Sequence, residues 1–221
     1  MDLVLNSVEA RVVGALAEKA LATPDHYPLS LNSLVSACNQ KTGRDPVMDL
    51  GENEVAHALD SLMRKHLVGT SSGAGNRVAK YRHLLDHHFE LDQAGVASLA
   101  VLLLRGPQTV GEVRSRTGRL HEFETLEAAE AAVRGLVERD EPLVLELPVQ
   151  PGRKEPRFAH VLSGTPEVEA LEERPPTFSP AMQAARAEGD RIAALEEKVT
   201  DLESELGDLR DAFERFREQF E

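Results

Sequence analysis

The stretch that decides the fold is residues 28–81, PLSLNSLVSACNQKTGRDPVMDLGENEVAHALDSLMRKHLVGTSSGAGNRVAKY. Apolar residues recur at helical spacing over 30–38 and again over 52–66. Two short strands are expected at 67–72 and 77–82, joined by a turn rich in glycine, which tolerates a positive φ. The order helix, linker, helix and hairpin is typical of a winged-helix module.

Helix starts around this stretch follow from side chains that satisfy free backbone N–H groups. Asn6 followed by Glu9 predicts a capping box for a preceding helix, which Pro24 ends. Ser30 predicts the N-cap of the helix 30–38, and Asp49 with Glu52 predicts a capping box for the helix 52–66.

A second, degenerate copy of the module is expected over 107–162. Val96, Ala100 and Leu104 repeat the spacing of the first helix, and Thr109 with Glu112 is another capping box. A hairpin from 143–147 to 158–161 completes the copy. A period of about 80 residues indicates duplicated domains and not a solenoid.

The C-terminal part has a different pattern. Residues 165–180 hold four prolines and are expected to be a stiff linker. Beyond them, steps of three and four predict a coiled-coil seam that would form a homodimer interface: Ile192, Leu195, Val199, Leu202, Leu206, Leu209, Phe213, Phe216 and Phe220. Flanking charges attract in both parallel and antiparallel pairings, so polarity stays open, as does a helix folded back on its own domains.

These patterns predict a mainly α fold with small β-hairpins, of the α+β class: tandem winged-helix domains followed by a coiled-coil helix. The expected divisions are domain 1 over 1–86, domain 2 over 87–164, the linker 165–180 and the helix 181–221.

Composition limits the compartment and the partners. A single cysteine among 221 residues excludes an internal disulfide framework and fits a reducing cytoplasm. The N-terminus lacks signal-peptide character, and the longest aliphatic run, 99–104, is too short to cross a bilayer, so no membrane partner is expected. The net charge of −13 argues against strong non-specific DNA binding, but residues 164–221 carry most of the acidity.

Cations and polar groups nevertheless gather where such modules contact DNA, at the hairpins and the second helix of each pair. The candidate nucleic-acid contacts are Lys41, Arg44, Asn53, His57, Arg64, Lys65, Arg77, Lys80, Arg82, Arg114, Arg116, Arg153, Lys154 and Arg157. The alternative for the hairpins is charge for solubility. The second copy's outer helix face is acidic, with Glu127 and Glu130, and phosphates would repel it.

The linker 39–48 is open to two interpretations. Its polar donors, including Asn39, Gln40 and Lys41, would suit an anionic group or a partner. Alternatively, Asn39 and Gln40 cap the end of the preceding helix while 46–48 packs down.

Taken together, several segments resemble the YceH-like family of uncharacterised bacterial proteins. They are Tyr27-Pro28-Leu29-Ser30, Ala37-Cys38-Asn39-Gln40-Lys41-Thr42, Arg44, Pro46-Val47-Met48, Gly75-Asn76-Arg77, Leu102-Leu103-Leu104-Arg105-Gly106, Gly111-Glu112-Val113-Arg114-Ser115-Arg116 and Pro151-Gly152-Arg153-Lys154. The resemblance runs along the whole chain and implies a tandem winged-helix fold. It supplies no activity or ligand.

Catalysis and cofactors are not expected. The eight histidines show no metal-ligand spacing, and the glycines of 69–75 lack the lysine of a phosphate-binding loop. Cys38 lies on an apolar helix face and is expected in the core. We therefore expect a dimeric DNA-binding protein, a transcriptional regulator or nucleoid-associated factor, and as the alternative a protein–protein interaction adaptor without DNA binding.

Overall fold

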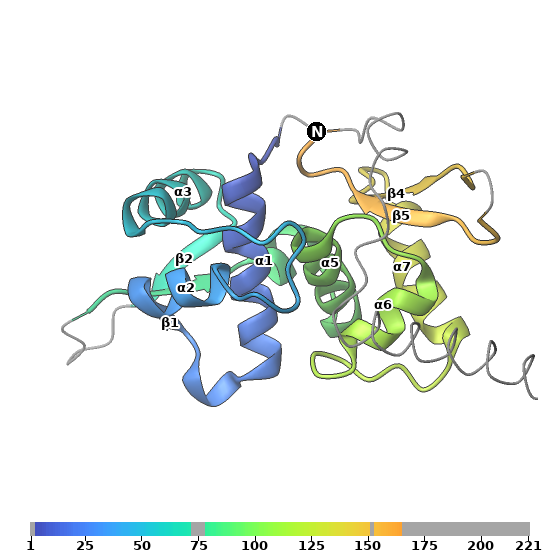
Figure 1. Cartoon of the computed structure of the whole chain (residues 1–221), viewed down its shortest axis with the longest axis horizontal. Helices are drawn as coiled ribbons and strands as arrows, with labels where there is room; N and C mark the ends of the chain where they lie inside the picture. The colour runs from blue at the N-terminus through green and yellow to red at the C-terminus, as the bar shows by residue number, and fades with distance from the viewer. Residues whose placement is uncertain (1–2, 72–77, 151–152, 165–221) are drawn as a thin grey trace, which may run out of the picture. The chain divides into compact units, whose positions relative to one another are not determined.

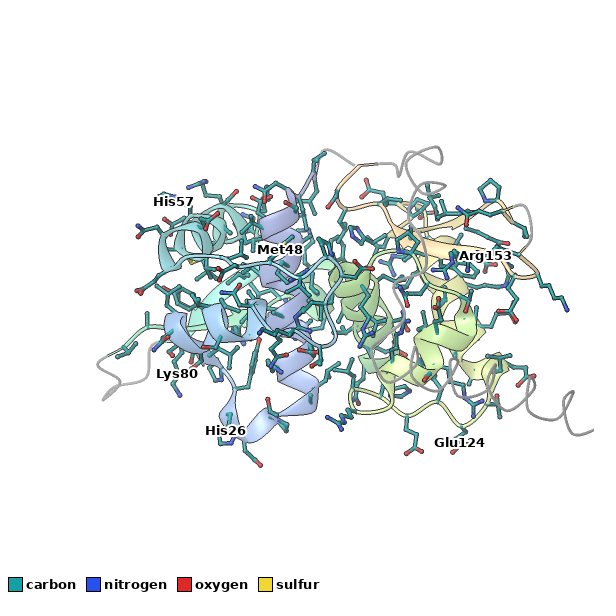
Figure 2. All side chains as sticks on the ribbon, viewed as in Figure 1. His26, Met48, His57, Lys80, Glu124 and Arg153 are labelled. Atoms are coloured by element: carbon teal, nitrogen blue, oxygen red, sulfur yellow. The ribbon has the colours of Figure 1, made fainter. Side chains whose placement is uncertain are left out.

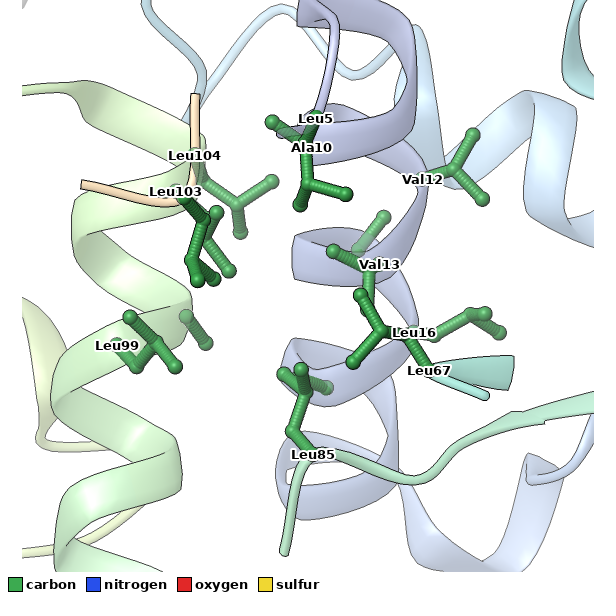
Figure 3. Close-up of a cluster of buried hydrophobic side chains, with 14 of the residues drawn as sticks. Leu5, Ala10, Val12, Val13, Leu16, Leu67, Leu85, Leu99, Leu103 and Leu104 are labelled. Carbon is green, nitrogen blue, oxygen red and sulfur yellow. The ribbon is translucent and has the colours of Figure 1, made fainter. Parts of the chain in front are cut away.

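In the computed structural model, α1 (Ser7–Ala22) packs against α5 (Gln93–Arg105) (Figures 1 and 3). The helices run in opposite directions, with Ala10 level with Leu104 and Leu16 level with Leu99 (Figure 3). Both are apolar around most of their circumference, which is the pattern of a helix buried on several sides. One hydrophobic cluster continues through both helices and joins the two halves of the chain.

The structure describes residues 3–71, 78–150 and 153–164, all within one compact unit, Met1–Glu173. Over these residues the fold is mixed α+β, with seven α-helices and two small antiparallel sheets. No helix among them is long and apolar enough to span a membrane. The predicted linker 165–180 and the coiled-coil helix 181–221 lie outside the described residues, so the predicted seam stays a prediction.

The first half builds a three-stranded sheet beside three α-helices. After α1 come the 3₁₀ turn η1 (Pro24–His26), β1 (Leu29–Ser30), α2 (Leu31–Cys38), α3 (Glu52–Arg64), β2 (Val68–Ser71) and β3 (Lys80–His83). The strand order is β1-β3-β2. In the central strand, Tyr81 is paired with Leu29 of β1 on one side and with Thr70 of β2 on the other.

The second half follows the short helix α4 (Leu85–Phe89). Its elements after α5 are α6 (Val110–Thr117), α7 (Leu126–Val137), β4 (Val144–Leu147) and β5 (Arg157–His160). Gln108 forms a single bridge with Phe158 and exchanges two backbone hydrogen bonds with it, 3.0 and 2.7 Å long. This bridge stands where the β1–β3 pairing stands in the first half.

The two halves also repeat their packing. In each half the first helix contacts the next two helices and the returning strand, and the last helix contacts the strand that follows it. The predicted capping boxes Asn6–Glu9 and Thr109–Glu112 and the Ser30 N-cap are confirmed. The element order predicted for both halves is therefore present.

One local prediction was wrong. The N-cap of α3 is Gly51, whose N–H donates to Glu54, and not Asp49 with Glu52. The actual capping residues, Gly51 and Glu54, lie two residues further along the chain than the predicted pair. The short helix α4 lies across residue 86, where the first expected domain ends, and it includes His87 and His88.

Candidate nucleic-acid interface

The outer face of α3 is polar and mostly acidic. Apolar residues three or four apart form the buried face: Val55, Ala58, Leu59 and Leu62. The predicted contacts Asn53, His57 and Arg64 are all exposed on the other side (His57 is labelled in Figure 2). Glu52, Glu54 and Asp60 are exposed as well. This face therefore carries three carboxylates and one arginine, and its net negative charge would repel phosphates.

The cations of the first hairpin lie on β3. Lys80 and Arg82 point to one side of the strand because alternate residues share a face. Arg82 is exposed and Lys80 is partly exposed (Figure 2). The N–H of His83 donates to the Tyr27 hydroxyl at 2.6 Å, which ties the end of the strand to the turn before β1. Arg77 lies outside the described residues.

In the second hairpin, Arg153 and Lys154 are exposed in the segment before β5 (Arg153 is labelled in Figure 2). Arg157 is differently placed. Its Nη1 donates to the carbonyl of Pro107 at 2.8 Å, and its Nη2 lies 3.4 Å from Glu112. Arg157 therefore holds β5 against the start of α6.

The two predicted arginines of α6 also have internal partners. Arg114 is exposed, but its guanidinium donates to the carbonyls of Phe123 and Glu124 at 3.3 and 2.9 Å. Arg116 pairs with Glu112 one turn earlier at 3.3 Å. Arg114 thus fixes the segment that joins α6 to α7, and the Arg116 pair lies within α6.

Arg44 is a correction to the predicted contact surface, because its side chain is completely buried. It binds both oxygens of Glu18, at 3.0 and 2.6 Å, and the carbonyl of Ala37. Arg11, buried beside it, donates to the carbonyls of Cys38 and Pro46. These two arginines hold the segment 39–50 against α1 from the inside.

The ends of the same segment are joined by Asn39. Its side chain donates to the carbonyl of Leu50 at 2.9 Å and accepts the Leu50 N–H at 2.8 Å. The Asp45 N–H donates to the carbonyl of Leu104 at the end of α5. These contacts give Asn39 a structural role. The predicted packing of 46–48 is wrong in part, because Pro46 and Val47 are exposed and only Met48 packs against the core. Lys41 is exposed as well.

Lys65, at the end of α3, also makes contacts inside the fold. Its ammonium lies 2.7 Å from a carboxylate oxygen of the buried Glu9 and donates to the carbonyl of Val4 at 2.8 Å. Burial acts to raise the pKa of Glu9, but hydrogen bonds from Lys65, Ser61 and Asn6 outweigh it and lower the pKa. Lys65 therefore fastens α3 to the start of α1.

Comparison with known proteins places the chain in a family. Residues 5–153 match the family described as "Protein of unknown function, DUF480". The chain belongs to the DUF480 family. It is also similar over the full length of both chains to UPF0502 proteins of Geobacter sulfurreducens and Geobacter metallireducens, each 52% identical, and of Geotalea daltonii, 51% identical.

The predicted resemblance is thereby confirmed at the level of a family of uncharacterised bacterial proteins, DUF480/UPF0502. The family match covers α1 to β4 and so includes both halves of the described unit. These names give no activity and no partner.

Within the described residues of this DUF480 protein, no group of three or more histidine, cysteine, aspartate or glutamate side chains could hold a metal ion. Two partly buried histidines occupy equivalent positions at the ends of β3 and β5, His83 and His160. Burial lowers the pKa of His83, and it lowers the pKa of His160 to about 4, so both rings are neutral at pH 7.

The predicted contacts thus divide into two sets. Those with exposed or partly exposed side chains and no internal ion pair among the described residues are Lys41, Asn53, His57, Arg64, Lys80, Arg82, Arg153 and Lys154. Those engaged inside the fold are Arg44, Lys65, Arg114, Arg116 and Arg157.

Sequence reasoning missed one further cation, Arg105 at the end of α5. It is partly exposed and has no side-chain hydrogen bond or ion pair with any described residue. Its only signal in the sequence was the segment Leu102-Leu103-Leu104-Arg105-Gly106, which was part of the family resemblance.

Proposed function

We propose that this DUF480 protein is a tandem winged-helix protein that binds duplex DNA, mainly through phosphate contacts made by its two hairpins. The observation that carries the proposal is the repeated arrangement of two helices and a hairpin, with exposed cations on each hairpin. The exposed cation of the first hairpin is Arg82, and those of the second hairpin are Arg153 and Lys154. Arginine and lysine on a hairpin suit contact with phosphate oxygens.

The pairing of the two halves supports this proposal. Equivalent helices, α1 and α5, meet in opposite directions, as the same element does on both sides of an isologous dimer. The two hairpins then lie on opposite sides of the α1–α5 pair (Figure 1). Helix-turn-helix proteins commonly use two such related modules on successive turns of DNA.

The acidity of α3 and α7 limits how DNA would be held. Glu127 is exposed on α7, and Arg134 there is already paired with Glu130 at 2.9 Å. We therefore assign contact to the hairpins, with Lys41 as an additional cation, and we assign no role in phosphate contact to the outer faces of α3 and α7. Binding of this kind is weakly sequence-specific and strongly dependent on salt.

The remaining parts of the proposal concern the tail and the setting. The seam from Ile192 to Phe220 would join two chains as a homodimer. We propose that a dimer of tandem modules acts in the cytoplasm as a transcriptional regulator or a nucleoid-associated factor. We also propose that the family is the one described as YceH-like.

A second function is favoured by one observation, the acidic outer faces of α3 and α7. An adaptor that binds a basic protein surface through these faces would need no DNA contact. In that case the hairpin cations would only keep the chain soluble.

Duplex binding by the full chain separates the two functions. Fluorescence anisotropy with a mixed-sequence duplex at about 50 mM salt should show binding. Arg82→Gln and the pair Arg153→Gln with Lys154→Gln should each weaken it. Arg134→Gln removes the same charge from the acidic face of α7 and should leave affinity unchanged. Absence of binding by the unmodified chain would favour the adaptor.

A further inference from the structure

A row of charged side chains crosses from the first half to the second between the segment 39–50, the end of α5 and α6. At one end Glu18 binds Arg44 with both oxygens and lies 3.3 Å from Lys19. At the other end Glu112 lies between Arg116 and Arg157, at 3.3 and 3.4 Å. Both carboxylates are therefore already shared between cations.

Arg105 stands between these two groups. A Cβ built on Gly43 would lie 3.4 Å from Arg105 Nη2 and 3.9 Å from Glu18 Oε1, so the guanidinium reaches the backbone of the segment 39–50. No carboxylate of the described residues lies within 4.0 Å of it. Burial lowers the pKa of Arg105, and so do the like charges of Arg116 and Arg44, while Glu18 and Asp45 act in the opposite direction.

Among the described residues, the charges of this row do not balance. The cations there are Lys19, Arg44, Arg105, Arg116 and Arg157, and the carboxylates are Glu18, Asp45 and Glu112. The C-terminal end of α5 adds only about half a negative charge. A partly buried excess of positive charge costs free energy, and a bound anion would recover part of it.

We propose that Arg105 is the central donor of a binding site for a phosphate-type oxyanion, with Arg116 beside it and the backbone at Gly43 as the facing wall. A planar guanidinium donates two parallel hydrogen bonds to such an oxyanion, which a lysine does not. Gly43 has no side chain that would cover Arg105, and its φ of +76° disfavours other residues at this position. The site is separate from the hairpins and does not rest on DNA binding by them.

Thermal unfolding of the full chain tests the site with inorganic phosphate as the probe. At equal pH and ionic strength, phosphate in place of chloride should raise the Tm by about 3 °C. Arg105→Gln should lose this rise. In chloride it should be no less stable than the unmodified chain, because it removes like-charge repulsion. A merely structural arginine would behave in the opposite way.

Two further variants sharpen the result. Arg105→Lys keeps the charge without the planar fork, and titration calorimetry should show its phosphate affinity about tenfold lower. Arg119→Gln, an exposed arginine between α6 and α7, should keep the full response. The proposal is overturned if phosphate gives no more stability than chloride, or if Arg105→Gln still responds to it.

The source of the phosphate is decided by a separate measurement. If Arg105→Gln loses the phosphate response but binds duplex DNA like the unmodified chain, the site takes a free phosphate or a small phosphate ester. If it loses both, the DNA backbone supplies the group. If the unmodified chain responds to phosphate but binds no duplex, the function proposed above fails and this site stands.

Discussion

Gly14 of α1 lies so close to Leu103 of α5 that a Cβ on the glycine would be 3.0 Å from the Leu103 Cβ. The same Cβ would lie 3.1 and 3.2 Å from two carbons of Leu104. Both helices are held by further packing on their other sides, so neither moves away easily. Gly14 therefore sets the distance between the two halves.

Gly14→Ala should destabilise the protein. Overpacking costs about 1–3 kcal/mol, and the better helix propensity of alanine returns about 1 kcal/mol. Gly135→Ala in α7 is the matched control, because nothing lies within 4 Å of its Cβ, and it should stabilise by about 0.5–1 kcal/mol. Urea unfolding measures both, and equal effects of the two substitutions would refute the close contact.

Glu18→Gln should make stability less dependent on pH. Burial acts to raise the pKa of the Glu18 carboxyl, but hydrogen bonds and charge from Arg44 lower it below the ordinary value of 4.5. A lowered folded-state pKa contributes stability above the unfolded pKa, and this stability is lost as pH falls through the folded pKa.

The free energy of unfolding of the unmodified chain should thus exceed that of Glu18→Gln by about 2 kcal/mol near neutral pH. This difference should shrink below about pH 4. Denaturant titrations at several pH values measure this difference. Glu122→Gln, on an exposed carboxylate, serves as the control. A difference that grows at acid pH would contradict the ion pair.

Cys38 should be unreactive in the folded protein. It is fully buried on α2, and burial raises the pKa of its thiol to about 12, so almost no thiolate exists at pH 8. Labelling with an aromatic disulfide should be more than about 100-fold slower in the native chain than in denaturant. Native labelling at the rate of a free thiol would show that α2 is not packed as described.

Local patterns were readable from the sequence because their partners are close along the chain. Asn6 with Glu9 and Thr109 with Glu112 needed three residues of context, and the helical spacing of apolar residues placed the buried face of α3. The repeat of elements followed from the same spacing in both halves.

Side-chain burial could not be read in this way. Arg44 and Arg157 appeared to be surface cations, but their partners Glu18 and Pro107 lie 26 and 50 residues earlier in the chain. Lys65 likewise depends on Glu9, 56 residues before it. Arg105 lies at a helix end, where a cation is ordinary, and only the folded structure shows that it makes no ion pair with a described carboxylate.

The measurement that tests the central claim most directly is the salt dependence of duplex binding by the full chain. Between about 50 and 200 mM salt, affinity should fall about 100-fold, as expected for a few phosphate contacts, and Arg82→Gln should reduce the slope of log K against log salt by about 1. No binding at the lower salt, or a slope that Arg82→Gln leaves unchanged, would contradict the account.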